Sequence, residues 1–343
     1  MLLTRRALNR ALLARQLLLT RAALPPQKAI EAVGGLQAQE AKPPYLALWT
    51  RLEGFTRDAL HDAIGRRKVV RGTMMRGTLH LVSRNDYLSW RPALQPALSR
   101  IAEGITKNAY DAEALCGIAR EFFEEQPRPF EELRERFPKT DARAMAYTVR
   151  LHLPLLMVPD ESTWSYPPNA PFAVAETFLE AKLKPAAPKE LVLRYLAAFG
   201  PATPADFQNW SGLAGARALF DELRPKLETF RDEKKRELFD LPNALRPDED
   251  TDAPVRLLGE FDSAILGHAD RSRIIDDEHR PRVATKNLRI LPTFLVDGFV
   301  AGTWAIEKKK VDLTPFVKLD KRTRAALEEE GERLLRFVSE APR

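Results

Sequence analysis

The sequence predicts an α+β protein in which one arrangement of helices and strands occurs about three times before a smaller β-rich module. Apolar residues recur at helical spacing through most of the first 240 residues. About three times, a group of short helical stretches is followed by two strand-like stretches around a turn. From about residue 254, strand-like pieces alternate with loops instead. The repeat is one of structural order, since the segments share little sequence identity.

The first occurrence begins with helices predicted over residues 5–20 and 25–35, the second of which starts at Pro25 and Pro26. A third helix is predicted where apolar residues recur at helical spacing, at Tyr45, Leu48, Trp49 and Leu52. Thr56 is the expected N-cap of a short helix that continues through Leu60 to Ile64. Residues 69–82 then alternate in polarity, which predicts a hairpin of two short strands carrying several basic residues.

The second occurrence has helices predicted over residues 112–125, 129–136 and 141–152. Its hairpin is predicted to join Leu155–Val158 to Thr163–Tyr166 around a Pro-Asp-Glu-Ser turn. The third has helices over 189–199, 204–210 and 213–223, with Thr203 as a cap. Strands over 227–231 and 237–241 flank a charged turn. Three helices followed by a β-hairpin is the winged-helix arrangement, so the sequence predicts tandem winged helices.

The remaining chain predicts strands over residues 255–258, 289–295 and 299–306, with a hairpin turn at Asp297-Gly298. A polar helix is expected near 319–338, and Lys308–Lys310 is expected to be a solvated charge run. The acidic, proline-containing segment Arg246–Pro254 is the candidate linker. These patterns divide the chain into four regions: 1–105, 106–186, 187–245 and 254–343.

Composition restricts the class of protein. A chain of 343 residues with 44% hydrophobic and 30% charged residues is typical of a globular protein with more than one domain. The single cysteine, Cys116, excludes a disulfide framework and a four-cysteine zinc site, and it fits a reducing, cytoplasmic setting. No apolar run approaches the roughly 20 residues of a membrane span. The net charge of +6 and pI near 9.4 permit a polyanionic partner.

One short stretch, Gly34 to Glu40, carries the strongest candidate for chemistry. Gly34 and Gly35 stop the preceding helix, and Pro43 and Pro44 follow shortly afterwards. On an extended backbone, Gln37 and Gln39 would lie on one side and the apolar residues between and before them on the other. We therefore expect two neutral amides, each able to donate and accept hydrogen bonds, beside packed helices. Alone, the pattern is also that of ordinary exposed glutamines.

Basic residues around the predicted hairpins are candidates for contacts with DNA. In the first hairpin the candidates are Arg71, Arg76 and His80, together with the neutral Thr78. In the third they are Lys234, Lys235 and Arg236, and further along the chain they are Arg271 and Arg273. Each could equally belong to a solvated turn, and His80 could pack beneath a site. Asp262, His268 and Asp270 could be considered metal ligands, but no compact ligand set appears, so neither a metal nor a cofactor is expected.

Five stretches together resemble one family: 34–40, 71–82, 194–213, 257–274 and 292–304. They are similar to the winged-helix bacterial DNA glycosylases of the AlkZ type, and the resemblance runs over nearly the whole chain. It implies tandem winged helices and a small β-barrel arranged as a C-shaped clamp around DNA. It also implies excision of bulky N7-alkylated purines or unhooking of interstrand crosslinks.

The family's catalytic signature is glutamine, an aliphatic residue, then glutamine, which matches Gln37 and Gln39; a sister branch has aspartate at the second position. The resemblance thus implies a DNA repair enzyme acting on double-stranded DNA. No lysine for Schiff-base chemistry stands out, so we expect a monofunctional, monomeric glycosylase that leaves an abasic site and associates with the nucleoid. Glu40 is a rival catalytic group, expected to point away from both glutamines. The alternatives are a non-catalytic winged-helix transcriptional regulator and a protein-binding scaffold.

Overall fold

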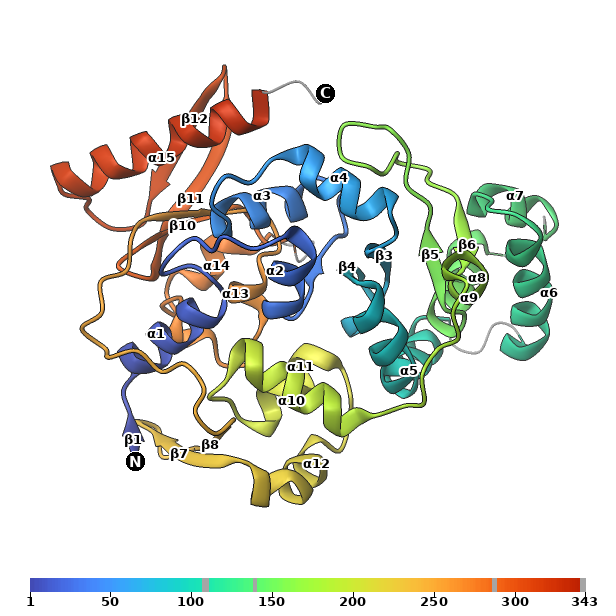
Figure 1. The fold of residues 1–343 in the computed structure, drawn as a ribbon, viewed down its shortest axis with the longest axis horizontal. Helices are drawn as coiled ribbons and strands as arrows, with labels where there is room; N and C mark the ends of the chain where they lie inside the picture. Colours follow the sequence, from blue (N-terminus) through green and yellow to red (C-terminus); the bar gives the residue numbers. More distant parts are fainter. Residues whose placement is uncertain (107–110, 138–140, 286–288, 340–343) are drawn as a thin grey trace.

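The computed structural model describes residues 1–106, 111–137, 141–285 and 289–339. It confirms the α+β class: helices surround three separate β-sheets within these residues. In Figure 1 the first region lies in the middle of the molecule, the helices of the second region lie on one side, and the C-terminal sheet with the last helix lies on the other.

The first region follows the predicted order. Its elements are β1 (Leu2–Leu3), α1 (Arg5–Arg15), α2 (Pro26–Ala32), β2 (Leu36–Gln37), α3 (Pro43–Arg51), α4 (Arg57–Gly65), β3 (Val69–Thr73) and β4 (Leu79–Ser83). The Thr56 side chain accepts from the Ala59 backbone N–H, which confirms the predicted cap. Helix α1 ends earlier than predicted because Leu17 has a left-handed backbone, with φ 56°.

A long helix that the sequence analysis did not predict, α5 (Arg84–Thr106), follows the first hairpin. It contains Pro92 and Pro96, which ordinarily argue against a helix interior. Its buried apolar residues belong to the larger core of the protein and pack beside the second region, so tertiary burial outweighs the local cost.

The three helices predicted in the second region are confirmed as α6 (Ala112–Glu125), α7 (Phe130–Glu135) and α8 (Ala142–His152). The predicted hairpin is only half right. Strand β5 (Leu155–Met157) pairs with β6 (Phe172–Val174), and residues 163–166 lie in the loop between them. Ser165 has a left-handed backbone, and its hydroxyl lies 2.6 Å from the Tyr45 hydroxyl, which ties this loop to α3. A short helix α9 (Ala175–Leu179) follows β6.

The first two hairpins join in a single five-stranded sheet with the order β2-β4-β3-β5-β6. Strands β3 and β5 are antiparallel, with Gly72 opposite Leu156. A side chain at Gly72 would bring a Cβ within 2.7 Å of the Tyr87 ring and 3.0 Å of the Leu155 carbonyl oxygen, so only glycine fits there. The first and second regions are therefore joined by backbone hydrogen bonds across the sheet.

The third region contains α10 (Pro188–Phe199), α11 (Pro204–Ser211), α12 (Ala216–Leu223), β7 (Glu228–Asp232) and β8 (Glu237–Asp240), close to the predicted ranges. Thr203 and Asp206 form a capping box at the start of α11. Strand β1 adds to β7 in parallel, so the first residues of the chain complete this sheet. The candidate linker, 246–254, has no helix or strand, and the Arg6 Nε donates to the Glu249 carbonyl oxygen within it.

The C-terminal strands are β9 (Arg256–Leu258), β10 (Thr293–Val296), β11 (Phe299–Glu307) and β12 (Lys310–Pro315), followed by α15 (Lys321–Ser339). Asp297 and Gly298, both with positive φ, form the predicted hairpin turn. Strand β12 was not predicted, because Lys308 and Lys309 form a second such turn where a solvated run was expected. The four strands form an open sheet over the described residues, so the barrel that the resemblance implied is not confirmed.

Three further short helices lie between β9 and β10: α13 (Ser263–Leu266), η3 (Arg271–Arg273) and α14 (Arg280–Val283). Within the described ranges, no helix combines the length and the apolar character required to cross a bilayer.

A buried ion pair joins the segment after the glutamines to the C-terminal module. Arg51, at the end of α3, donates two hydrogen bonds to the Asp262 carboxylate, at 2.7 and 2.8 Å, and both side chains are inaccessible to solvent. Asp262 also caps α13 through the Ala264 N–H. The pairing gives each charge a partner of opposite sign, and it accounts for Asp262 without a metal ion.

We expect Asp262→Ala to lower the free energy of unfolding by about 3–5 kcal/mol, because it leaves the Arg51 charge buried without a counter-charge. Chemical denaturation followed by circular dichroism measures this difference. The control is Glu124→Ala, which removes an ion pair on the surface of α6; its expected cost is below about 0.5 kcal/mol. Equal effects of the two substitutions would contradict the assigned role of the buried pair.

Candidate active site

The glutamine stretch is an edge strand of the five-stranded sheet. Gly34 and Gly35, with φ of 77° and 86°, turn the chain out of α2. Strand β2 then pairs with β4, and the Ala38 N–H continues the pairing by donating to the Leu79 carbonyl oxygen at 2.7 Å. The extended backbone predicted from sequence is therefore confirmed. Leu36 and Ala38 are buried, while Gln37 is half-buried and Gln39 is exposed.

Both glutamine carbonyl oxygens accept hydrogen bonds from groups of the protein. The Gln37 Oε1 accepts from Arg76 Nη2 at 2.9 Å, and the Gln39 Oε1 accepts from the Leu79 backbone N–H at 3.3 Å. A guanidinium and a backbone amide can only donate, so each side-chain oxygen must face its donor. The two NH₂ groups therefore point away from these donors, and neither has an acceptor among the described residues.

Arg76 connects the first hairpin to the third region. It occupies the turn between β3 and β4 with a left-handed backbone, φ 56°. Besides Gln37, it donates to the Trp210 carbonyl oxygen on α11 at 2.8 Å. Burial lowers the pKa of the Arg76 guanidinium to about 10, so the group remains a cation at neutral pH. Because Arg76 is itself bound to α11, its hydrogen bond holds the Gln37 amide in place.

Arg71 holds the backbone of the same stretch. It is buried, and it donates to the Ala38 and Gln39 carbonyl oxygens at 2.9 and 3.0 Å. Its guanidinium also lies 5.0 Å from the centroid of the Tyr166 ring. Both Arg71 and Arg76 were predicted to contact phosphates; in the structure each holds one part of the glutamine stretch, and the phosphate contacts stay predictions.

His80 lies opposite Gln37 on the neighbouring strand, so their side chains share one face of the sheet. It is 3% exposed, and its Nδ1 contacts the Thr78 carbonyl oxygen at 3.0 Å, which requires the proton on Nδ1. Burial lowers the His80 pKa to about 3. The imidazole is therefore neutral and unsuited to accept a proton near pH 7. The hydroxyl of Thr78, half-buried, donates to the Met75 carbonyl oxygen.

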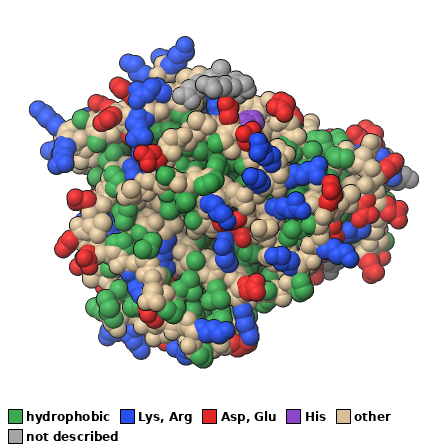
Figure 2. All heavy atoms as spheres, viewed as in Figure 1, with side chains coloured by type: hydrophobic (Ala, Val, Ile, Leu, Met, Phe, Trp, Pro, Cys, Tyr) green, Lys and Arg blue, Asp and Glu red, His purple; other side chains and the backbone are tan. Residues whose placement is uncertain are grey.

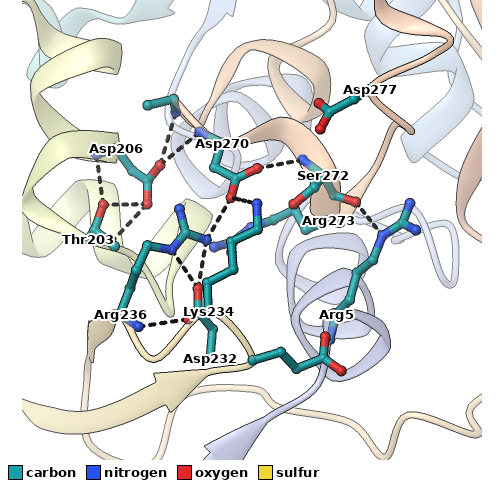
Figure 3. A network of polar contacts seen from close by, with 12 residues as sticks. Arg5, Thr203, Asp206, Asp232, Lys234, Arg236, Asp270, Ser272, Arg273 and Asp277 are labelled. Carbon is teal, nitrogen blue, oxygen red and sulfur yellow. Dashed lines mark hydrogen bonds and ion pairs between the residues drawn. The ribbon is translucent and has the colours of Figure 1, made fainter.

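The basic candidates of the third hairpin, and the two further along the chain, divide into paired and unpaired groups. Figure 3 shows Lys234 donating to Asp270, and Arg236 contacting both Asp232 and Asp270, with distances near 2.7 Å. The Arg273 guanidinium is buried and donates to the Pro201 carbonyl oxygen. By contrast, Lys235 is exposed at the turn and Arg271 is half-buried, and neither side chain has an ion pair within the described part of the chain.

Glu40 lines the same cavity as Gln39 and also a second cavity that neither glutamine lines, so its expected orientation away from the glutamines stays a prediction. The pairing with β4 ends at Ala38, so the side-chain alternation does not continue to residue 40. His268, considered as a metal ligand, contacts the Phe199 carbonyl oxygen at 2.9 Å. In the described residues, no group of three His, Cys, Asp or Glu side chains is arranged to hold a metal ion.

Positive charge is unevenly distributed on the surface. In Figure 2, Lys and Arg side chains gather over the middle of the visible face, between the first and second regions, while acidic side chains gather over α6 and α7. A polyanion would therefore be attracted to particular parts of the molecule rather than to its whole surface.

Comparisons with known proteins identify the family of the chain. The family model for AlkZ-like DNA glycosylases matches residues 30–337. A curated relative, the interstrand DNA cross-link repair glycosylase of Streptomyces sahachiroi, is 27% identical over 336 residues, which cover 88% of each protein. The solved structure of the Streptomyces sahachiroi DNA glycosylase AlkZ has the same fold, with a TM-score of 0.79, 20% identity, and coverage of 98% of this chain and 97% of that one. The chain belongs to the AlkZ-like DNA glycosylase family and is a DNA repair enzyme that hydrolyses N-glycosyl bonds.

Proposed function

We propose that the enzyme excises N7-alkylated purines, as bulky adducts or interstrand crosslinks, from double-stranded DNA and leaves an abasic site. Gln37 and Gln39 are the proposed catalytic residues. The three helical regions would each be a winged helix and, with the C-terminal module, would form a clamp around the duplex. The enzyme would act as a monomer in the cytoplasm, on nucleoid DNA. The name of the curated relative supports crosslinks as one class of substrate.

The observation that carries this proposal is the orientation of the two amides. Arg76 donates to the carbonyl oxygen of Gln37, and the Leu79 N–H donates to that of Gln39. These hydrogen bonds orient the two amides. Each oxygen keeps a second lone pair that can accept from a water molecule, and each NH₂ can donate to a sugar, phosphate or base acceptor. Two such groups on one side of the strand could position a water molecule beside the sugar.

The reaction itself requires little acid catalysis. Alkylation at N7 makes the purine cationic, so the electron pair of the breaking C1′–N9 bond neutralises that charge as the base departs. The sugar then approaches an oxocarbenium-like transition state. A water oxygen forms the new bond to C1′, and its proton passes to solvent. Neutral amides suit this reaction because the leaving group is already activated.

The regulator considered as an alternative would need no pair of glutamines. It would be expected to bind undamaged DNA in a sequence-specific manner and to release no base. Membership of a glycosylase family over residues 30–337 favours the enzyme.

Single-turnover excision of N7-methylguanine from a duplex tests the assignment of the glutamines. We expect Gln37→Ala and Gln39→Ala each to slow excision about 100-fold, because each removes a group that positions reacting atoms. Strand breaks should appear only after alkali treatment if the enzyme leaves an abasic site. Gln27→Ala, on the surface of α2, is the matched control and should keep the wild-type rate. Wild-type rates in both folded site variants would rule the assignment out.

The pH dependence of the same reaction tests whether a titrating base takes part. Below pH 3 His80 would gain a proton, and above pH 10 Arg76 would lose one, while the amides do not titrate. The single-turnover rate should therefore be constant between about pH 6 and 8. A rate that rises severalfold across this interval would show that a general base is required and would contradict the mechanism.

A further inference from the structure

A cavity of about 660 Å³ lies between the glutamine stretch and the second region, and the chemistry proposed above does not use it. Gln39 and Glu40 line one side. Arg150 of α8 lines another, and Trp164 and Tyr166 contribute from the loop before β6. Because Gln39 is part of its wall, any group of a DNA substrate that enters the cavity would be bound next to the proposed site of reaction.

Arg150 is held in this wall without a partner for its charge. It is half-buried, and its Nε is inaccessible to solvent and has no hydrogen bond. In the described parts of the chain its guanidinium has no ion pair with an acidic residue, and it lies 5.4 Å from the centroid of the Tyr147 ring. Burial lowers the pKa of Arg150, but an arginine stays protonated at neutral pH. Arg71 and Arg91, by contrast, donate to backbone carbonyl oxygens.

Neighbouring residues of α8 form one face with Arg150. At about 100° per residue, positions 143, 146, 147 and 150 fall within an arc of roughly 100°. Arg143 is exposed, and its guanidinium lies 5.7 Å from the same Tyr147 ring. Ala146 lines the cavity and adds little bulk. This face of α8 therefore carries two arginines whose guanidinium groups both lie near the Tyr147 ring.

Arg271 is a second arginine of this kind. Arg271 is half-buried, and its Nε is buried without a partner. Its charge contributes, after burial, to the lowered pKa of Arg76, which holds Gln37. Arg271 and Arg150 thus share partial burial and the lack of an acidic partner within the described residues.

The lining of the cavity favours an anion over a cationic purine. The cavity is lined by three cations and two carboxylates, which leaves a net positive charge. The cations are Lys42, Arg71 and Arg150, and the carboxylates are Glu40 and Glu131. The aromatic rings already have cations near them: Arg71 lies 5.0 Å from Tyr166, and Arg57 lies 5.3 Å from Trp164. An N7-alkylated purine would bring a further positive charge to these rings.

We propose that Arg150, with Arg143 on the same face of α8, binds a DNA backbone phosphate on the Gln39 side of the lesion. The inference rests on the proposed function, because it assumes that a duplex is presented to the glutamines. Arginine can donate two parallel hydrogen bonds to a phosphate, and the two terminal NH₂ groups of the half-buried Arg150 could form such a pair and position the strand.

Binding of an undamaged duplex, measured by fluorescence anisotropy at several salt concentrations, tests this site without requiring catalysis. Arg150→Gln should weaken binding about tenfold at low salt and reduce the slope of log K against log salt by about 1, because one phosphate contact is lost. Arg150→Lys keeps the charge and should keep most of the slope. Arg120→Gln, which removes a cation of α6 that is paired with Glu124, is the control and should change neither quantity.

Folding is checked for each variant by its thermal unfolding, and a folded Arg150→Lys variant allows the comparison even if the glutamine variant unfolds. Wild-type affinity and slope in folded Arg150→Gln, or loss of slope in Arg150→Lys, would overturn the phosphate site. If the Arg150 variants change binding as expected but the wild-type protein releases no alkylated base, the proposed function is contradicted and this site stands. Normal excision with no Arg150 effect would contradict this site alone.

Discussion

The hydrogen bonds of the short edge strand β2 determine the geometry of the site. Pairing with β4 through Ala38 keeps the backbone extended, so Leu36 and Ala38 turn into the core while the glutamines remain on the outer side. Arg71 then holds the backbone carbonyl oxygens, and Arg76 holds the Gln37 amide. Without this strand pairing, neither arginine would have its acceptors in place. Two consecutive glycines with positive φ allow the strand to start directly after α2.

Contacts from several regions keep the site together. Arg76 reaches from the first hairpin to α11 of the third region, and the Tyr45–Ser165 contact ties the loop of the second region to α3. The buried Arg51–Asp262 pair attaches α3 to the C-terminal module. Because the ion pair and the Arg76 contact are satisfied only when distant segments are correctly packed, the position of the glutamines depends on the whole fold rather than on their own stretch.

Features set by neighbouring residues could be predicted from sequence, and features set by distant ones could not. The extended glutamine stretch followed from glycines, prolines and alternation within ten residues, and the caps at Thr56 and Thr203 from their own helices. Helix α5 was missed because Pro92 and Pro96 argue locally against a helix that tertiary burial stabilises. Residues 163–166 have strand-like composition, yet they form a loop because Phe172–Val174 pairs with β5 instead. The acceptors of Arg71 and Arg76 are equally invisible in the sequence.

The charged residues also show that contacts with distant residues could not be predicted from sequence. The position of Lys234 and Arg236 at a hairpin tip predicts contacts with a polyanion, yet both are neutralised by aspartates of the same molecule. Nothing in the sequence distinguishes Arg150 from other arginines, because an arginine on a helix is ordinarily solvated. Its distinguishing property is partial burial without a counter-charge, which exists only after folding. A cation that has lost water and gained no acidic partner is in an unfavourable state that an incoming anion relieves, whereas a paired cation must first give up its partner. The unpaired state is therefore a stronger indication of an anion-binding site than a basic hairpin is.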